Sequence, residues 1–442
     1  MKKVSLIAAA VVSTLAAGTA SAVEFDYHGY MRAGFGGNVD GGAQVCYGNG
    51  GPSAHVVGRL GDECDLYAEL ILNANNVWQS AEGDSFNIHT LLAYGTEEDP
   101  GPMQRDTRGA AFQAVGTSAD DPWSGQRASM REAWVDYTMA NGMSLWAGKR
   151  YYARKDIHIL DMYYINTSGD GIGVENIDAG PGKLSAAVFQ RDWKAPILDE
   201  DGTAVEDTQL YSQAYTLDLR YNGIQANKDG SFDFALMIGQ PSKTEAQDDA
   251  IDNELGNFGD YGLDETGVSF TAEHTQGNFF GGFNKVVVQY STQGFAWDTY
   301  GVNSHMGSGY NMELGQEDRK VWRFIDWGVI EQDQWNLGYS FIYSQLDDPN
   351  NGNGTRWNAV VRPGYKWSET MSTILEMGYY VQDDPWMDSS EDLSKVTIAQ
   401  QWQAGSNFWA RPAIRVFASA YSGDMAVDNN DFMVGAQVEA WW

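Results

Sequence analysis

The last twelve residues of the chain, Asp431 to Trp442, alternate between apolar and polar positions, and this constrains the fold more than any other feature. A period of two with one apolar row is typical of a β-strand whose two faces meet different surroundings. In a soluble sandwich the apolar row would face a core; in a transmembrane barrel it would face lipid, with the polar row lining a lumen. The apolar row contains Phe432, Val434, Ala436, Val438, Ala440 and Trp442. Trp441 belongs to the polar row, beside Gln437 and Glu439, where an aromatic ring requires an explanation.

Four further segments, residues 25–35, 59–72, 283–290 and 408–418, show the same alternation. The second places Arg59 and Glu63 in one row with Tyr67, and the fourth places Phe408 and Ala410 in its apolar row. Single exposed aromatics are ordinary on the surface of a soluble sandwich, but five polar rows that each contain an aromatic favour a lumen. The aromatics concerned are Tyr30, Tyr67, Phe283, Trp409 and Trp441.

The first 22 residues have the three regions of a secretory signal peptide. Two lysines precede the apolar run Val4 to Ala17, and Ala20-Ser21-Ala22 is typical of a cleavage site. The apolar run is short for a membrane-spanning helix. We therefore expect residues 1–22 to be removed from an exported protein, and residues 23–442 to form one domain.

The composition excludes several classes of protein. No run of about eighteen apolar residues follows the expected cleavage site, which excludes a helical membrane protein. The chain has 50 Gly, 23 Tyr and 16 Trp but only 11 Pro, which favours a large β protein with many turns and aromatic girdles. Its net charge of −32 argues against nucleic acid or anionic lipid as a partner bound by charge. We interpret the acidic stretches Asp248 to Asp264 and Asp383 to Asp392 as solvated faces of loops.

The two cysteines, Cys46 and Cys64, lie in one Gly-rich region. An even pair in an exported chain is typical of a disulfide, so we expect a bond between them, with free thiols as the alternative. The six histidines show no paired spacing of metal ligands. No G-x-S-x-G nucleophile motif occurs either. The sequence therefore indicates no metal, no cofactor and no enzyme activity.

A lumen that combines aromatic rings with charged groups suits sugars. A sugar ring has an apolar C–H face that can lie on an aromatic ring, and a rim of hydroxyls that donate and accept hydrogen bonds. Arginines and carboxylates make strong, charge-assisted hydrogen bonds to such hydroxyls. Removing about 50 Å² of apolar sugar surface from water contributes on the order of 1 kcal/mol per ring. Weak, repeated binding of this kind suits a channel, which must release what it attracts.

At these residues the chain resembles the maltoporin family, the maltodextrin-selective porins of the outer membrane. The resemblance extends from Val23 to Trp442 and is dense in Leu145 to Asp161 (LWAGKRYYARKDIHILD), Phe270 to Gln276 (FTAEHTQ) and Gln400 to Val416 (QQWQAGSNFWARPAIRV). It implies an all-β fold: a transmembrane antiparallel β-barrel of 18 strands, with long external loops and an inward-folded constriction loop. It also implies a homotrimer in the lipid of the bacterial outer membrane that conducts maltose and maltodextrins.

The resemblance also assigns substrate-binding residues, position by position. It implies an aromatic slide of Tyr30, Tyr67, Trp123, Phe283, Trp409 and Trp441. It implies a polar track of Arg32, Arg59, Glu69, Arg131, Arg154, Asp156 and Asp161, with Tyr163 at the constriction. The family places the loop of Trp123 over the pore of a neighbouring subunit. Arg131 has the parity of the apolar row, so it requires a β-bulge to face the lumen.

Alternative functions remain open. One is a porin of the same fold for another oligosaccharide such as sucrose, whose constriction residues would differ from those found here. Another is a general porin without a preferred sugar. An outer-membrane enzyme or adhesin on a barrel would need a nucleophile with its base, or a separate exported domain, and we find neither in the sequence.

Overall fold

The computed structural model describes residues 23–41, 47, 55–63, 66–96, 126–198, 204–242, 266–301, 318–349, 351–426 and 431–442. Most of these residues belong to one antiparallel sheet of 18 strands, in which each strand pairs with the next along the chain. The strands are β1 (Glu24–Asn38), β2 (Leu66–Gln79), β3 (Ser85–Thr96), β4 (Gln126–Thr138), β5 (Ser144–Ile157), β6 (Met162–Ala179), β7 (Gly182–Leu198), β8 (Ala204–Asn227), β9 (Gly230–Ser242), β10 (Gly267–Phe279), β11 (Gly282–Thr292), β12 (Lys320–Glu331), β13 (Trp335–Asp348), β14 (Gly352–Lys366), β15 (Met371–Asp383), β16 (Glu391–Gln403), β17 (Ala413–Ser422) and β18 (Phe432–Trp441).

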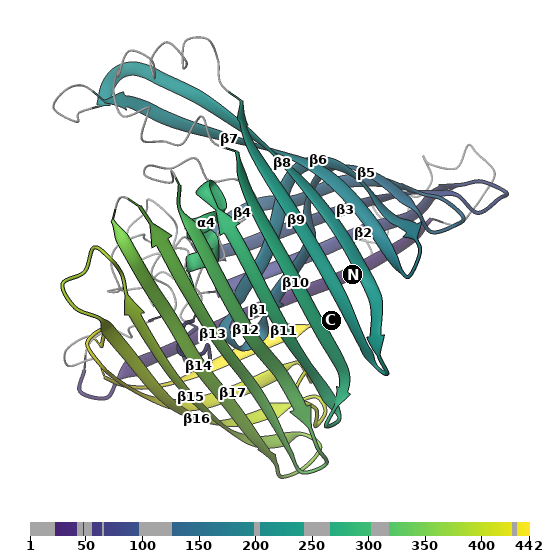
Figure 1. Cartoon of the computed structure of the whole chain (residues 1–442). Coiled ribbons are helices and arrows are strands. Elements are labelled where there is room, and N and C mark those ends of the chain that lie inside the picture. Colours follow the sequence, from purple (N-terminus) through teal and green to yellow (C-terminus); the bar gives the residue numbers. More distant parts are fainter. Residues whose placement is uncertain are drawn as a thin grey trace.

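The first and last strands pair with each other, so the sheet closes into a barrel (Figure 1). The pairing runs from Tyr30 opposite Trp441 to Asn38 opposite Met433. Closure removes the unpaired N–H and C=O groups of an open edge, which lipid could not satisfy. The predicted all-β, antiparallel barrel of 18 strands is confirmed.

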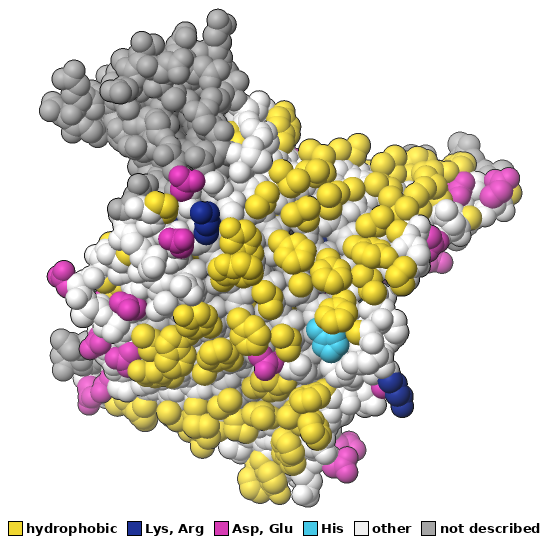
Figure 2. Space-filling model, in the orientation of Figure 1, with side chains coloured by type: hydrophobic (Ala, Val, Ile, Leu, Met, Phe, Trp, Pro, Cys, Tyr) yellow, Lys and Arg dark blue, Asp and Glu magenta, His cyan; other side chains and the backbone are white. Residues whose placement is uncertain are grey.

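The barrel has an apolar outer face and a mostly polar inner face. In β18 the side chains of Phe432 and Val434 are exposed on the outside, whereas Met433, Gln437 and Glu439 are buried inside. Apolar side chains form a broad band over the outer face, and charged ones lie mostly at its margins (Figure 2). Such a band is the surface that hydrocarbon covers in an outer-membrane barrel. Within the described ranges, every helix is too short or too polar to cross a membrane.

The two ends of the barrel differ in the lengths of their connections. At one end the turns are short, such as Lys228 and Asp229 between β8 and β9. At the other end the connections are longer and include residues 39–65 and 97–125. Outer-membrane barrels have short periplasmic turns and long external loops, which orients this one. Five predicted features lie outside the described residues, namely the signal peptide at 1–22, Cys46, Cys64, Trp123 and the acidic stretch at 248–264.

The tip of the β5–β6 hairpin lies inside the barrel, and we call residues 149–169 the constriction hairpin. The 3-10 helix η1 (His158–Leu160) joins its two strands. The register of β5 against β6 shifts between Tyr152 and Lys155, where Ala153 has a φ of 43°. Bulges of this kind bend a strand away from its sheet. One apolar cluster unites the hairpin tip with the inner faces of β11 to β14, and it includes Ile157, Leu160, Met162, Val287, Ile325, Ile342 and Val360.

Charged groups anchor the constriction hairpin to the same side of the barrel. Lys155 Nζ lies 2.7 Å from Asp233 Oδ2 on β9 and 3.0 Å from Glu273 Oε1 on β10. The Tyr164 hydroxyl donates to Glu273 Oε2 at 2.7 Å. Because Glu273 is buried, these two contacts, with Lys285 at 3.2 Å, replace the water that its carboxylate has lost.

Residues 55–63, part of the connection between β1 and β2, also fold into the barrel; we call them the inner segment. Their backbone pairs with η1, since His55 N donates to Leu160 O at 2.9 Å. They also contact a strand that is distant in the sequence, since Leu60 N donates to Glu376 Oε1 on β15 at 2.9 Å. The inner segment therefore braces the constriction hairpin against the wall.

Two expectations from the alternation are wrong. Arg59 and Glu63 lie in the inner segment and not on the strand of Tyr67. Phe408 and Ala410 lie in the turn between β16 and β17 and are buried, so they do not belong to the lipid-facing row. A period of two records which side chains of an extended chain point the same way. It does not record whether that chain is paired into the sheet.

The acidic stretch at residues 383–392 is also not the uniformly solvated face that we expected. Asp384 is buried, and its carboxylate accepts from Arg356 Nε at 2.9 Å and from Arg356 Nη2 at 2.7 Å. The Tyr300 hydroxyl donates to the same group at 2.6 Å. Asp383 and Asp388 are exposed, as predicted. The Arg356 guanidinium replaces solvent around the Asp384 carboxylate. The composition of the stretch does not reveal such a partner, because Arg356 lies outside it.

Candidate functional site

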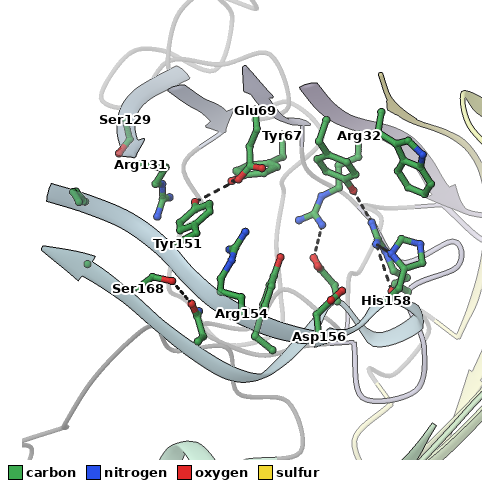
Figure 3. A pocket seen from close by; sticks show the side chains of 18 residues that line it. Arg32, Tyr67, Glu69, Ser129, Arg131, Tyr151, Arg154, Asp156, His158 and Ser168 are labelled. Atoms are coloured by element: carbon green, nitrogen blue, oxygen red, sulfur yellow. Dashed lines mark hydrogen bonds and ion pairs between the residues drawn. The ribbon is translucent and has the colours of Figure 1, made fainter. Parts of the chain in front are cut away.

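A cavity of about 650 Å³ lies between the constriction hairpin and strands β1, β2, β4 and β18 (Figure 3). Its lining includes most of the predicted site residues, namely Tyr30, Arg32, Arg59, Tyr67, Glu69, Arg131, Arg154, Asp156, Asp161, Tyr163 and Trp441. It also includes residues that we did not assign, namely Ser129, Lys149, Tyr151, His158, Asn166, Ser168 and Gly169. Phe283 and Trp409 are not in this lining, and Trp123 lies outside the described residues.

Strand register brings aromatic and charged side chains together on one wall of the cavity. Trp441 on β18 is opposite Tyr30 on β1, which is opposite Glu69 on β2. The next inward row contains Glu439, Arg32 and Tyr67 in the same order. Opposite side chains of antiparallel strands lie about 5 Å apart at Cβ. Tyr30 and Tyr67 therefore each have a charged residue directly opposite, namely Glu69 and Arg32.

The aromatic rings form a continuous path that the sequence analysis did not fully define. Its order is Tyr67, Tyr30, Trp441, His158, Trp409 and Phe283. The His158 ring centroid lies 5.7 Å from that of Trp441 and 5.1 Å from that of Trp409. The Phe283 ring stacks on Trp409 at 6.5 Å, with 21° between the planes. His158 thus connects the two aromatics outside the cavity lining with those inside it.

The constriction hairpin brings charged groups to the other side of the cavity. Arg32 Nη1 lies 2.5 Å from Asp161 Oδ2, so one ion pair joins the wall to the hairpin. The Arg154 guanidinium lies between two rings, 3.5 Å from the centroid of Tyr151 and 4.5 Å from that of Tyr163. Aromatic rings attract the flat faces of a guanidinium, whose N–H donors lie in its own plane and point away from the rings. Arg154 is therefore held in place on the hairpin side of the cavity (Figure 3).

Arg131 reaches the cavity through a β-bulge in β4. The register pairs Leu91 with Glu132 and Leu92 with Met130, so Arg131 is an extra residue without a partner on β3. A single extra residue reverses the parity of the strand beyond it. Arg131 consequently lines the cavity although its position in the sequence matches the apolar row.

Glu439 binds three arginines beside the aromatic path. This residue is 1% exposed, and its carboxylate meets Arg59 Nη2 at 3.1 Å, Arg411 Nε at 2.6 Å and Arg415 Nη2 at 3.1 Å. Arg59 Nη2 also donates to the Tyr30 hydroxyl at 2.8 Å. Buried charges linked in this way have few alternative arrangements, so the ring of Tyr30 is fixed. Among the described residues, no group of three His, Cys, Asp or Glu is arranged to hold a metal ion.

His158 provides a ring without a charge. Burial holds the pKa of His158 well below its usual range. The Glu439 carboxylate, 3.8 Å from Nε2, raises this pKa, and the guanidiniums of Arg59 and Arg411 act in the same direction as burial. The imidazole is therefore neutral near pH 7, and it extends the aromatic path without adding a cation to the passage.

Tyr151 was missed because the strand that carries it leaves the wall. Near the start of β5, Leu145 points outward and is exposed. Lys149 and Tyr151 have the same parity as Leu145, so in a straight strand they would also point outward. Once β5 bends inward, this row faces the cavity instead of lipid. The Tyr151 hydroxyl donates to Glu69 Oε1 at 3.4 Å. The clustering of Tyr, Arg and Lys over residues 149–155 was the available signal, since a lipid-facing strand would not contain it.

A closed barrel with an apolar outer band and a narrowed polar lumen defines a class, the multi-pass porins of the bacterial outer membrane. The LamB porin family matches residues 25–442, and the chain belongs to that family.

Two relatives are similar over their whole length. The maltoporin of Hahella chejuensis is 37% identical over 447 residues, which cover 100% of this chain and 98% of that protein. The maltoporin of Photobacterium profundum is 34% identical over 459 residues, which cover 100% of this chain and 99% of that protein. The crystal structure of Acinetobacter baumannii OccAB1 has a TM-score of 0.51 at 9% identity, over 96% of this chain and 98% of that one. This last likeness supports the fold alone.

Proposed function

We propose that this protein is a passive channel for maltose and maltodextrins. The observation that carries the proposal is the continuous aromatic path beside charged hydrogen-bonding groups in a narrowed barrel. Two full-length relatives that are themselves maltoporins support this choice of sugar. The protein then acts as a channel and not as an enzyme, because its side chains bind and release the sugar without altering a bond.

The proposed mechanism uses both sides of the cavity. The apolar faces of the glucose rings lie on the aromatic path, each contact contributing on the order of 1 kcal/mol through lost apolar surface. The sugar hydroxyls exchange partners along the polar track, from Arg32 and Asp161 to Arg154 and Glu69. Each contact is weak, and the next one lies close by, so the chain moves along without a deep trap.

The assembly belongs to the same proposal. We expect a homotrimer in which Trp123 of each subunit contributes the outermost stacking surface over a neighbouring pore. We also expect Cys46 and Cys64 to form a disulfide in the connection that contains the inner segment. Both expectations follow from the sequence and the family and are open to direct measurement.

Ion current through single channels in planar bilayers tests the function. Maltose, maltotriose and maltohexaose should block the current in a saturable way, with tighter binding for the longer chains because they contact more rings. Sucrose and raffinose are the controls. Tighter block by sucrose would favour a porin for another oligosaccharide, and the absence of block by every sugar would favour a general porin.

A further inference from the structure

A short helix at the external end of β11 packs on the inner wall of the barrel. The 3-10 helix η3 (Gln293–Phe295) leads into α4 (Ala296–Tyr300). Arg323, buried on the inner face of β12, donates from Nη1 to the carbonyls of Asp298 and Gly301, each at 3.1 Å. Its Nη2 donates to Tyr164 O of the constriction hairpin at 3.2 Å. One guanidinium therefore joins α4 to the hairpin and fixes α4 on the external side of the constriction.

Two tryptophans meet beside this helix. The ring centroid of Trp297 in α4 lies 5.6 Å from that of Trp386, which belongs to the external connection between β15 and β16, with 42° between the planes. Trp297 is half-buried and packs against the apolar cluster that includes Val321 and Leu346 on the barrel wall, whereas Trp386 is 48% exposed. We call Trp297 and Trp386 the outer aromatic pair.

Two arginines lie beside Trp297, the inner member of the outer aromatic pair. The Arg356 guanidinium lies 5.3 Å from the Trp297 ring centroid, and its N–H groups make the two bonds to buried Asp384 described above. Arg319 lies 5.9 Å from the centroid of the same ring, and it is paired with Asp348 at 2.7 Å. These ion pairs fix Trp297, while Trp386 keeps an exposed surface. The arrangement therefore presents one exposed indole face next to a ring that is held in place.

We propose that the outer aromatic pair is an additional binding platform for glucan chains, supplied by the subunit itself on the external side of the constriction. The proposal rests on the proposed function, since it extends the same sugar path outward. A glucose ring would stack on the exposed face of Trp386, beside the Trp297 ring 5.6 Å away. The platform would raise the local concentration of chain ends above the cavity, so it acts mainly on the rate of capture from outside.

The test is the kinetics of maltohexaose block in oriented single channels, with sugar added to one side at a time. Trp386→Ala should lower the association rate constant from the external side by roughly three- to tenfold, which corresponds to the loss of one stacked ring. The rate from the periplasmic side should stay within a factor of about two. Trp386→Tyr, which keeps a ring, should retain most of the external rate. Equal rates for wild type and Trp386→Ala from the external side would overturn the proposal.

A matched control uses an indole at the other rim. Trp367 is 59% exposed on the short turn between β14 and β15, outside both aromatic sets. Trp367→Ala should leave external association unchanged, so an effect as large as that of Trp386→Ala would also overturn the proposal. Wild-type block separates the two hypotheses. If maltohexaose does not block the wild type, the channel function fails; if it does and Trp386→Ala has no effect, only the platform fails.

Discussion

Trp441 shows how a large aromatic ring can belong to a polar row. The Arg411 guanidinium lies 4.5 Å from its ring centroid, and His158 meets it edge-on at 5.7 Å and 80°. Both neighbours fix the indole, and the ring also lines the cavity. An aromatic in this position is stabilised by cation–π contact on the protein side. It retains a surface on which an apolar sugar face can lie.

Replacing Trp409 by Ala should remove a stacking surface without altering charge. The expected loss is about 1–2 kcal/mol of sugar affinity from buried apolar area, or roughly tenfold in the middle of that range. Ion conductance should change little, because small ions do not require the ring. Titration of the current block by maltohexaose in wild type and variant measures both quantities. Unchanged block in Trp409→Ala would mean that sugars do not use the aromatic path.

The neutral state of His158 leads to a prediction about pH. Its pKa in the folded protein is lowered by burial, so the ring takes up no proton as pH falls through about 6.5, the value for an unperturbed His. Sugar block should therefore show no step near that pH. The unfolded chain does bind a proton there, so the His158 contribution to stability is present above about pH 6.5 and decreases below it.

Current block measured from about pH 8 to about pH 5.5, a range that brackets the ordinary pKa of His, checks this expectation in wild type and in His158→Asn. The variant keeps a polar side chain that cannot titrate in this range, so its profile should be flat as well. A step near that pKa that is present in wild type and absent from His158→Asn would show that His158 becomes charged in the passage.

At the scale of elements, regular strands were predictable and departures from the sheet were not. Parity placed Tyr30 and Trp441 in the lumen because β1 and β18 remain paired over their length. It failed at Arg59 and Phe408, which lie in connections that fold inward. A local pattern contains no information about bonds to distant strands, and those bonds determine the position of both connections.

Arg131 and Tyr151 show the same limit inside strands. The β4 bulge at Arg131 and the inward bend of β5 near Tyr151 both reverse which row faces the lumen. The family resemblance assigned Arg131 correctly to the cavity where parity did not. Tyr151 was assigned by neither, because its row points to lipid at Leu145 and changes surroundings only after the bend.

The constriction hairpin should loosen when its ionic anchor is removed. Lys155→Ala leaves the buried Glu273 with Lys285 as its remaining cation, so the loss of stability should be smaller than the roughly 3–5 kcal/mol that an uncompensated buried charge typically costs. We expect a larger and noisier single-channel conductance as the hairpin moves from its wall. Lys183→Ala is the matched control, because Lys183 pairs with Asp178 at the exposed turn between β6 and β7. Quiet, unchanged conductance in Lys155→Ala would mean that apolar packing alone holds the hairpin.

For the whole molecule, the apolar outer band requires detergent or lipid. The exposed side chains of this band, such as Phe35, Ile172 and Val416, would otherwise contact water. We therefore expect extraction only with detergent and a circular dichroism spectrum dominated by β structure. We also expect three copies per particle after gentle extraction. Light scattering corrected for bound detergent measures the number of copies, and a single chain per particle would contradict the trimer.

The inner segment has a consequence for the order of assembly. Leu60 bonds to Glu376, which is 316 positions further along the chain, and Gly61 N donates to Gln437 Oε1, 376 positions further. Contacts between such distant residues form late, because the intervening chain must be ordered first. We therefore expect the inner segment to reach its final position only after β15 and β18 have joined the wall. Closing the barrel and narrowing its interior are linked, since β18 both pairs with β1 and supplies Gln437.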